Sequence, residues 1–213
     1  MRKIALQILV FAFAATPFAA LAQAPKDGVF ISSEDVQAVL KRAADTKRTN
    51  PDNAIRIIDM GNYQLSVSVI HRGAMGGAPA SNATNPTPAP NPQPACGEQR
   101  PGTKGPSGIL HDDTAETYIV TSGSATLVTG GTIVNGRRSA PDNDVTTTLN
   151  GPSCSGVMVG YTTRDIKVGD IIVIPEGVPH GFSAIPDHVT YLSIRPDLKK
   201  VLQHGYVNPA IQK

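Results

Sequence analysis

The 213-residue chain has no tryptophan, only two cysteines and no long block of charges of one sign. Lys and Arg together number 19 against 17 for Asp and Glu, which leaves a formal net charge of +2. Without a basic stripe or tail, neither nucleic acid nor an anionic membrane surface is indicated as a partner. The charge balance therefore favours a small-molecule partner, and it leaves the oligomeric state open, a homodimer included.

Long apolar runs are also scarce, and the one candidate for a membrane span lies at the very start. Positive charges at residues 1–3 precede an apolar stretch at 4–15, an interruption at Thr16-Pro17 and small residues up to Ala22. The apolar stretch is shorter than the roughly 20 residues of a spanning helix, and this order is typical of a cleaved secretory signal. We therefore expect residues 1–22 to be a signal peptide and the protein to be periplasmic or secreted, without a membrane anchor after cleavage.

Cys96 and Cys154 are the two cysteines. An exported protein enters a compartment where disulfides persist, and an even count favours pairing. We expect a Cys96–Cys154 disulfide, with two unrelated buried thiols as the alternative.

One short amphipathic helix is predicted in an N-terminal extension at residues 23–54. Ser32 and Ser33 can cap it, Glu34 and Asp35 suit its first turn, and Val36, Val39, Leu40 and Ala43 follow at helical spacing. A main domain at 55–198 and a tail at 199–213 follow, because the mature chain is the size of one domain with extensions.

Residues 73–107 interrupt the main domain with Gly, Pro, Ala, Asn and Thr. Prolines occupy every second position from Pro86 to Pro94, and each removes a backbone donor and restrains its neighbour. No regular element can pass through that spacing. The stretch is predicted to be a surface insertion, either disordered or a lid over a pocket, with its far end held by Cys96.

Short apolar segments separated by glycine-containing turns fill the rest of the main domain. Residues 55–58 and 63–70 alternate with the period of a half-buried strand, and further strands are predicted at 117–121, 125–128, 132–134, 146–149, 157–159, 171–174 and 189–194. Many short antiparallel strands joined by tight turns indicate an all-β sandwich or barrel.

Two segments carry side chains that can bind a metal. In the first, Gly105 precedes His111 by six positions, and Glu116 precedes Gly123 by seven. In the second, Gly169-Asp-Ile-Ile-Val-Ile-Pro-Glu-Gly-Val-Pro-His places His180 just past a buried strand and a Pro-x-Gly turn. Strand residues two apart face the same side, so these groups can reach one interior point.

The two segments resemble the paired motifs of the cupin superfamily. That resemblance implies a single double-stranded β-helix, or jelly-roll, barrel with a metal inside. The first motif departs from the family, which has two histidines two residues apart before the glutamate. Either Ile109 stands at the place of the first histidine, which we favour, or Asp113 replaces the second and acts as a fourth ligand or general base. Ala184 stands where the family usually has Asn.

The resemblance implies that His111, Glu116 and His180 bind one divalent metal. Two imidazoles and a carboxylate with open positions suit Fe²⁺ and tolerate Mn²⁺, Ni²⁺, Co²⁺ or Zn²⁺. The favoured function is a metal-dependent enzyme for a small oxygenated organic molecule, with an Fe²⁺ oxygenase as the leading chemistry. A redox-neutral lyase, decarboxylase or isomerase and a non-enzymatic exported binding protein are the alternatives. The sequence is silent on the substrate.

Overall fold

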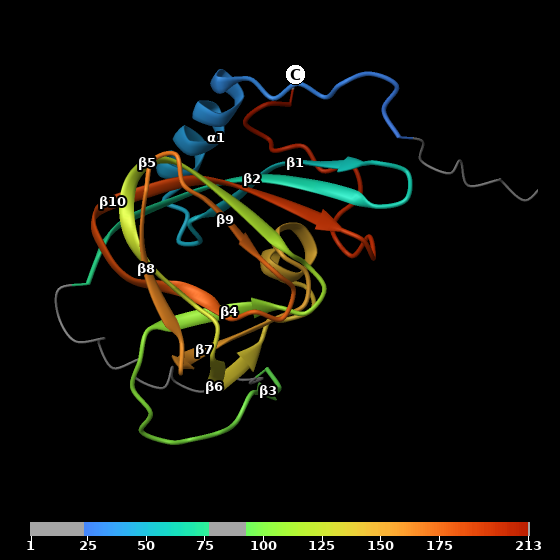
Figure 1. Ribbon diagram of the computed structural model, residues 1–213. Coiled ribbons are helices and arrows are strands. Elements are labelled where there is room, and N and C mark those ends of the chain that lie inside the picture. The colour runs from blue at the N-terminus through green and yellow to red at the C-terminus, as the bar shows by residue number, and fades with distance from the viewer. Residues whose placement is uncertain (1–23, 77–92, 213) are drawn as a thin grey trace, which may run out of the picture.

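The computed structural model describes residues 24–76 and 93–212 as a β-barrel with one helix packed against its side (Figure 1). The predicted signal peptide at 1–22 and most of the proline run lie outside these residues. No helix in the described part is both long and apolar enough to cross a membrane. The predicted all-β class with a short N-terminal helix is confirmed.

One α-helix, ten strands and one π-helical turn make up the described part of the chain. In order they are α1 (Ser33–Asp45), β1 (Asp52–Asp59), β2 (Gln64–Met75), β3 (Ala95–Cys96), β4 (Ser107–His111), β5 (Glu116–Thr129), β6 (Thr132–Arg138), η1 (Val145–Leu149), β7 (Ser153–Val159), β8 (Thr162–Lys167), β9 (Ile171–Ile174) and β10 (His180–Asp197).

The two longest strands, β5 and β10, build the barrel because each belongs to both of its sheets. They pair with each other, and every pair among the ten strands is antiparallel. One sheet has the order β1-β2-β10-β5-β9, and the other has β3-β6-β7-β4-β10-β5-β8. In Figure 1 both strands curve from one sheet into the other. This arrangement is the predicted double-stranded β-helix.

Helix α1 covers the outer face of β1 and β2. Its N-terminus has a capping box, in which the Asp35 N–H donates to the Ser32 hydroxyl at 3.0 Å and the Ser32 N–H donates to the Asp35 carboxylate at 3.1 Å. Val39 is buried against Ile55 and Val69. The helix thus forms where capping and spacing predict it.

Strand β5 corrects one prediction, because it runs without a break where two strands were expected. Gly123, expected to be a turn, lies inside it with φ of +73°. A side chain there would meet the His188 carbonyl oxygen at 1.9 Å, so only glycine allows β10 to approach. The bend lets the first half of β5 pair with β9 and the second half with β8.

The predicted strand at 146–149 is wrong, because Val145–Leu149 forms the π-helical turn η1. The Thr146 hydroxyl donates to the Ala140 carbonyl at 2.7 Å, and the Thr147 hydroxyl donates to the Asn143 carbonyl at 2.9 Å. Threonine favours strands by its β-branch, but here its hydroxyls satisfy local carbonyls and stabilise a helical turn. The turn ends at Asn150, which points into the barrel.

The boundaries of the insertion also differ from the prediction at 73–107. Strand β2 continues to Met75, and β3 pairs Ala95 and Cys96 with β6.

Strand β8 was not predicted at all. Its residues, Thr162–Lys167, include only one buried apolar side chain, so a hydrophobic pattern does not find it.

The C-terminal tail packs on the outside of the barrel. The Ile57 N–H donates to the Tyr206 carbonyl at 2.9 Å, and Ile211 is buried with the residues beneath α1.

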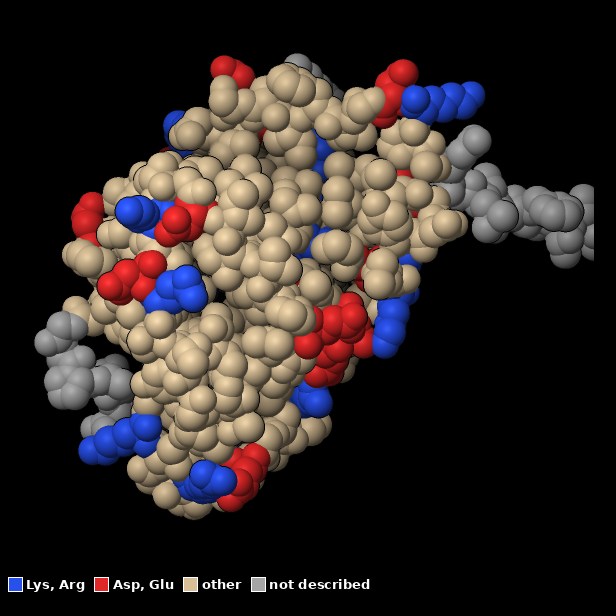
Figure 2. Space-filling model, in the orientation of Figure 1, with Lys and Arg blue, Asp and Glu red and all other residues tan. Residues whose placement is uncertain are grey.

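On the face drawn in Figure 2, basic and acidic side chains are interspersed, without a large patch of one sign.

Cys96 and Cys154 form a disulfide across 58 residues of sequence, which confirms the predicted pairing. The bond joins β3, at the far end of the insertion, to β7. Both cysteines are buried beside Ile133 and Met158. The disulfide therefore fixes one end of the insertion to a sheet of the barrel.

Replacing both cysteines by alanine should lower the free energy of unfolding by about 3 to 4 kcal/mol, because the disulfide restricts the unfolded chain over a long loop. Urea unfolding of the non-reduced parent and of the double variant measures the difference. Two free thiols in the denatured, non-reduced parent would contradict the pairing.

Candidate metal centre

Three side chains that can bind a metal converge inside the barrel. His111 ends β4, Glu116 begins β5 and His180 begins β10, and all three are buried. The turn before β10 is tied directly to β4, because the Gly177 N–H donates to the His111 carbonyl at 2.7 Å. The two motifs are thus joined by the backbone, and their side chains meet.

One carboxylate oxygen faces both imidazoles. Glu116 Oε2 lies 3.0 Å from His180 Nε2 and 3.5 Å from His111 Nε2. The two rings meet edge to face, with centroids 5.1 Å apart. Two ligands about 2.1 Å from one ion and at right angles to each other are about 3.0 Å apart, so this spacing suits a shared ion.

Neighbouring acceptors fix the tautomer of each histidine. His180 Nδ1 lies 2.9 Å from the Val178 carbonyl oxygen, which can only accept, so Nδ1 carries the proton. His111 Nδ1 lies 2.8 Å from the Ser153 hydroxyl, which donates its own proton to the Gly151 carbonyl at 2.8 Å. With Nδ1 bonded in this way, Nε2 is the nitrogen of each ring that faces Glu116, as in metal-binding histidines.

The other carboxylate oxygen of Glu116, Oε1, accepts three hydrogen bonds. Oε1 accepts from Arg195 Nε, from Asn150 Nδ2 at 3.0 Å and from the Ser193 hydroxyl at 3.3 Å. Tyr118 donates its hydroxyl to Oε2 at 2.7 Å. Burial alone would raise the pKa of Glu116, but the Arg195 charge and the neighbouring His111 and His180 hold the pKa well below its ordinary value. Glu116 is thus an ionised carboxylate with one oxygen turned toward the histidines.

Arg195 pairs with a second carboxylate. Its Nη2 donates to Asp52 Oδ2 at 2.5 Å, and its Nη1 donates to the Ser68 hydroxyl at 2.9 Å and the Leu149 carbonyl at 3.2 Å. Burial opposes the charge of this guanidinium, but Asp52 and Glu116 raise its pKa above the ordinary value. With both carboxylates ionised, the group carries one net negative charge, which a cation between Glu116 and the imidazoles would offset.

The residues present therefore fit a divalent metal: two imidazole nitrogens and one carboxylate oxygen, all within 4.8 Å of one another. One contact competes with it. Asn150 Nδ2 lies 2.9 Å from His111 Nε2 and donates to that lone pair. Binding of an ion at His111 requires this amide to move away, although its contact with Glu116 can remain.

Ile109 and Asp113, the two residues that the alternative alignments of the first motif put at a ligand position, lie in different places. Ile109 lies two residues before His111 on β4 and lines the same cavity, so it occupies the face expected of the missing histidine. Asp113 instead forms a surface ion pair with Lys199. It is not one of the three groups that converge, and the structure does not bring it to them.

Sequence reasoning missed the roles of Arg195, Asp52, Asn150, Ser153 and Tyr118. One signal was available for Arg195. Along β10 the residues with odd numbers from Val189 to Arg195 are buried, so an arginine continues an inward-facing series. A charged residue at an inward position indicates a buried partner.

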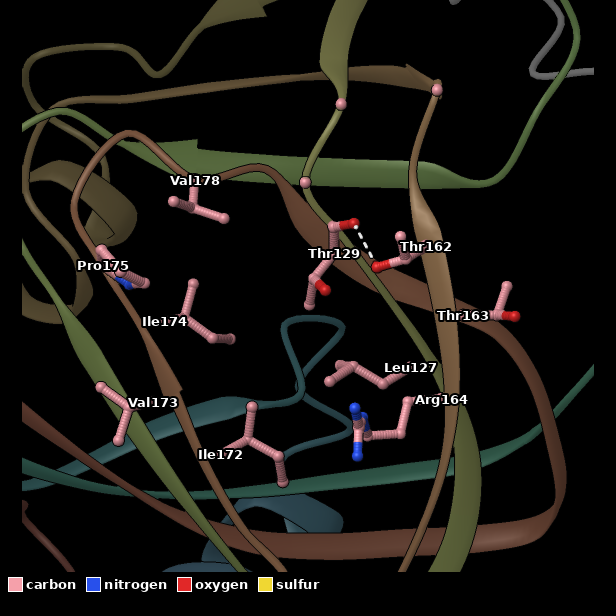
Figure 3. Close-up of a pocket in the computed structure, with 13 residues that line it drawn as sticks. Leu127, Thr129, Thr162, Thr163, Arg164, Ile172, Val173, Ile174, Pro175 and Val178 are labelled. Carbon is pink, nitrogen blue, oxygen red and sulfur yellow. Dashed lines mark hydrogen bonds between the residues drawn. The ribbon is translucent and has the colours of Figure 1, made fainter.

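Two cavities lie near the interior, and the larger one is not at this centre. The smaller, about 80 Å³, is lined by the three converging side chains together with Tyr118, Ile109 and Arg195, among others. The larger, about 490 Å³, opens between β8 and β9, and apolar, glycine and threonine residues with Arg164 line it (Figure 3). It contains no metal-binding side chain, so we place the chemistry in the smaller cavity.

Replacing Arg195 by glutamine should lower the free energy of unfolding by about 3 to 5 kcal/mol, because two carboxylates then remain buried without their cation. Arg138→Gln is the matched control, since its pair with Asp112 is partly exposed and contributes about 0 to 1 kcal/mol. Urea unfolding compares the two variants, and equal losses would contradict the role of Arg195.

Acid should destabilise the metal-free protein, starting near pH 6.5. Burial lowers the pKa of His111 below its ordinary value of 6.5, so the unfolded chain binds a proton there at a higher pH than the native state. Stability from neutral His111 is thus complete above that pH and falls as the pH drops. Glu116, whose pKa lies well below 4.5, adds a loss of the same sign at lower pH.

Urea unfolding measured from about pH 8 to about pH 4 gives this profile. His111→Gln should flatten the first part of the decline. An unchanged slope near pH 6.5 in that variant would show that another group causes it.

No family model matches the chain, and no curated protein matches it at a significant level. Among solved structures, the chain is similar to a Bacillus halodurans protein, at 14% identity over 88% of this chain and 93% of that one, with a TM-score of 0.39. It is also similar to the cupin domain of Schizosaccharomyces pombe Cnp3, at 8% identity over 68% and 61% of the two chains, with a TM-score of 0.34.

A Klebsiella pneumoniae protein with a double-stranded β-helix domain shows 16% identity over 71% of this chain and 81% of that one, with a TM-score of 0.32. Likenesses at this level say nothing of substrate or reaction. The strand topology carries the assignment of the fold: the chain folds as a double-stranded β-helix.

Proposed function

We propose that the protein is a metal-dependent enzyme that acts on a small oxygenated organic molecule inside the barrel. One observation carries the proposal. Two imidazole nitrogens and one oxygen of an ionised carboxylate converge in a buried space, all within 4.8 Å of one another. A divalent ion can accept a lone pair from each of these three atoms, and without it Asn150 and Tyr118 donate to two of them.

His111, Glu116 and His180 would hold the ion. Because Arg195 occupies one oxygen of Glu116, the carboxylate offers a single oxygen, and three protein ligands leave positions open. A bound divalent ion supplies Lewis acidity there, and Fe²⁺ also supplies redox chemistry with O₂. An Fe²⁺ oxygenase is the chemistry that we propose first.

The surrounding residues position the site. Tyr118 and Ser193 hold the Glu116 carboxylate, whereas the Val178 carbonyl and the Ser153 hydroxyl orient the two rings. Burial raises the pKa of Tyr118 well above its ordinary value, so its hydroxyl remains a donor to Glu116 at neutral pH. The ligands are thus oriented by the folded barrel before an ion or a substrate arrives.

The same three ligands would also serve a redox-neutral lyase, decarboxylase or isomerase. Dependence on O₂ separates the two: an oxygenase consumes O₂ as product forms, and a redox-neutral enzyme forms product without it. Export through residues 1–22 remains part of the proposal. It places the site in an oxidising compartment, where the Cys96–Cys154 disulfide would persist.

His111→Ala and His180→Ala should each purify with little metal, because loss of one ligand of three removes most of the affinity. Both should also lose the rise in melting temperature that added metal gives the parent. Metal analysis of protein purified without oxygen, together with thermal melting, measures both effects.

His71→Ala and His204→Ala are the controls, since these rings bond to Thr190 and Gln64 away from the centre. Asp113→Asn should also keep normal metal content, because Asp113 pairs with Lys199. Full metal occupancy in His180→Ala would show that the site is wrong and would favour a binding protein over an enzyme.

A further inference from the structure

Arg72 and Tyr191 line the same cavity as the three converging side chains. Neither is hydrogen-bonded to those side chains; the two are bonded to each other. Arg72 lies on β2, where alternation turns it to the inner face together with Ser68 and Ile70. Tyr191 lies on β10 next to β2, and its ring packs on Tyr118 with centroids 4.3 Å apart. The cavity therefore has a second polar end, apart from Glu116.

The guanidinium of Arg72 is held in place without an anion. It lies over the Phe182 ring, 5.3 Å from the centroid, and its Nε donates to the Tyr191 hydroxyl at 3.5 Å. Among the described residues, no Asp or Glu forms an ion pair with Arg72, and its two Nη groups make no hydrogen bond. Arg195, by contrast, bonds to two carboxylates.

Tyr191 supplies a further donor. Its hydroxyl oxygen accepts from Arg72, and its proton has no acceptor in the described part of the chain. Burial raises the pKa of this hydroxyl, so the proton stays in place at neutral pH. Guanidinium N–H groups and one O–H group thus face a cavity in which they lack an acceptor, which is the arrangement that binds an anion.

The charge and the volume of the cavity limit the class of molecule that it can bind. Asp52 and Glu116 exceed Arg195 by one negative charge, and a divalent ion together with Arg72 reverses the sign, so an anionic ligand is favoured. The cavity of about 80 Å³ is far below the roughly 300 to 1,000 Å³ of sites for drug-sized molecules. It suits a molecule of a few non-hydrogen atoms, and Ile70 and Ile109 give it apolar walls.

We propose that Arg72 and Tyr191 bind the carboxylate of a short 2-oxo or 2-hydroxy acid, which is the substrate of the centre. The planar guanidinium matches a carboxylate through two parallel hydrogen bonds. The neighbouring oxygen of such an acid then points toward His111, Glu116 and His180. This assignment rests on the proposed function and names its substrate class.

The experiment uses Co²⁺-loaded protein and two matched pairs of probes, pyruvate with pyruvamide and lactate with lactamide. The visible spectrum of Co²⁺ reports ligands that reach the metal, and calorimetry gives the affinity. We expect the acids to bind and the amides to bind at least about tenfold more weakly, because only the acids offer a charged acceptor to the guanidinium.

Arg72→Gln should weaken acid binding by about 10- to 100-fold and remove the preference for acid over amide, with unchanged Co²⁺ content. Tyr191→Phe should lose less, and Arg72→Lys should fall between the parent and Arg72→Gln because it keeps the charge without the planar fork. Arg164→Gln, in the larger cavity, is the matched control and should bind acids normally.

Equal binding of acids and amides, or acid binding that depends on Arg164 and not on Arg72, would overturn the assignment. So would binding of inorganic phosphate in place of the carboxylates. Failure to take up Co²⁺ would instead overturn the proposed function. In that case the shift in melting temperature that pyruvate gives the chelator-treated parent, and its loss in Arg72→Gln, still tests the carboxylate site.

Discussion

The ion pair between Arg195 and Glu116 is the interaction on which the centre of the barrel depends. It joins β10 to β5, and Asp52 extends it to β1, so strands from distant parts of the sequence share one buried charge group. Taking these charges from water is costly, and only mutual pairing with full hydrogen bonding offsets that cost. The pair also sets the orientation of Glu116: one oxygen faces Arg195, so the other must face His111 and His180.

The histidines receive their orientation from residues with no metal-binding chemistry of their own. A backbone carbonyl and a serine hydroxyl bond to the two Nδ1 atoms, which leaves both Nε2 atoms directed at one point. Asn150 touches both His111 and Glu116, so its amide is the group that an arriving ion would displace. Ile109 lines the same cavity two residues before His111, so three side chains remain that could hold a metal.

Two arginines face the interior of the barrel, and they differ in how many of their hydrogen-bond donors have partners within the protein. Arg195 donates to two carboxylates, a hydroxyl and a carbonyl, and its donors are thereby used in holding the fold together. Arg72 rests on an aromatic ring and keeps donors free toward the cavity. The larger cavity between β8 and β9 has more volume, but it lacks this combination of metal-binding groups and free donors, so volume alone is a poor guide to chemistry here.

Local patterns in the sequence determined much of the fold and identified the three side chains that converge inside the barrel. The Ser32 cap, the alternation in β1, β2 and β9, and the spacing around His111, Glu116 and His180 each act within a few residues, so they can be recognised without the rest of the chain. Only the tertiary structure decided which residues surround these three side chains. Asn150 and Arg195 reach Glu116 from 34 and 79 residues away, and their positions depend on the η1 turn and on strand register. Register and local turns are set by packing across strands, and a pattern read along one strand does not contain that information.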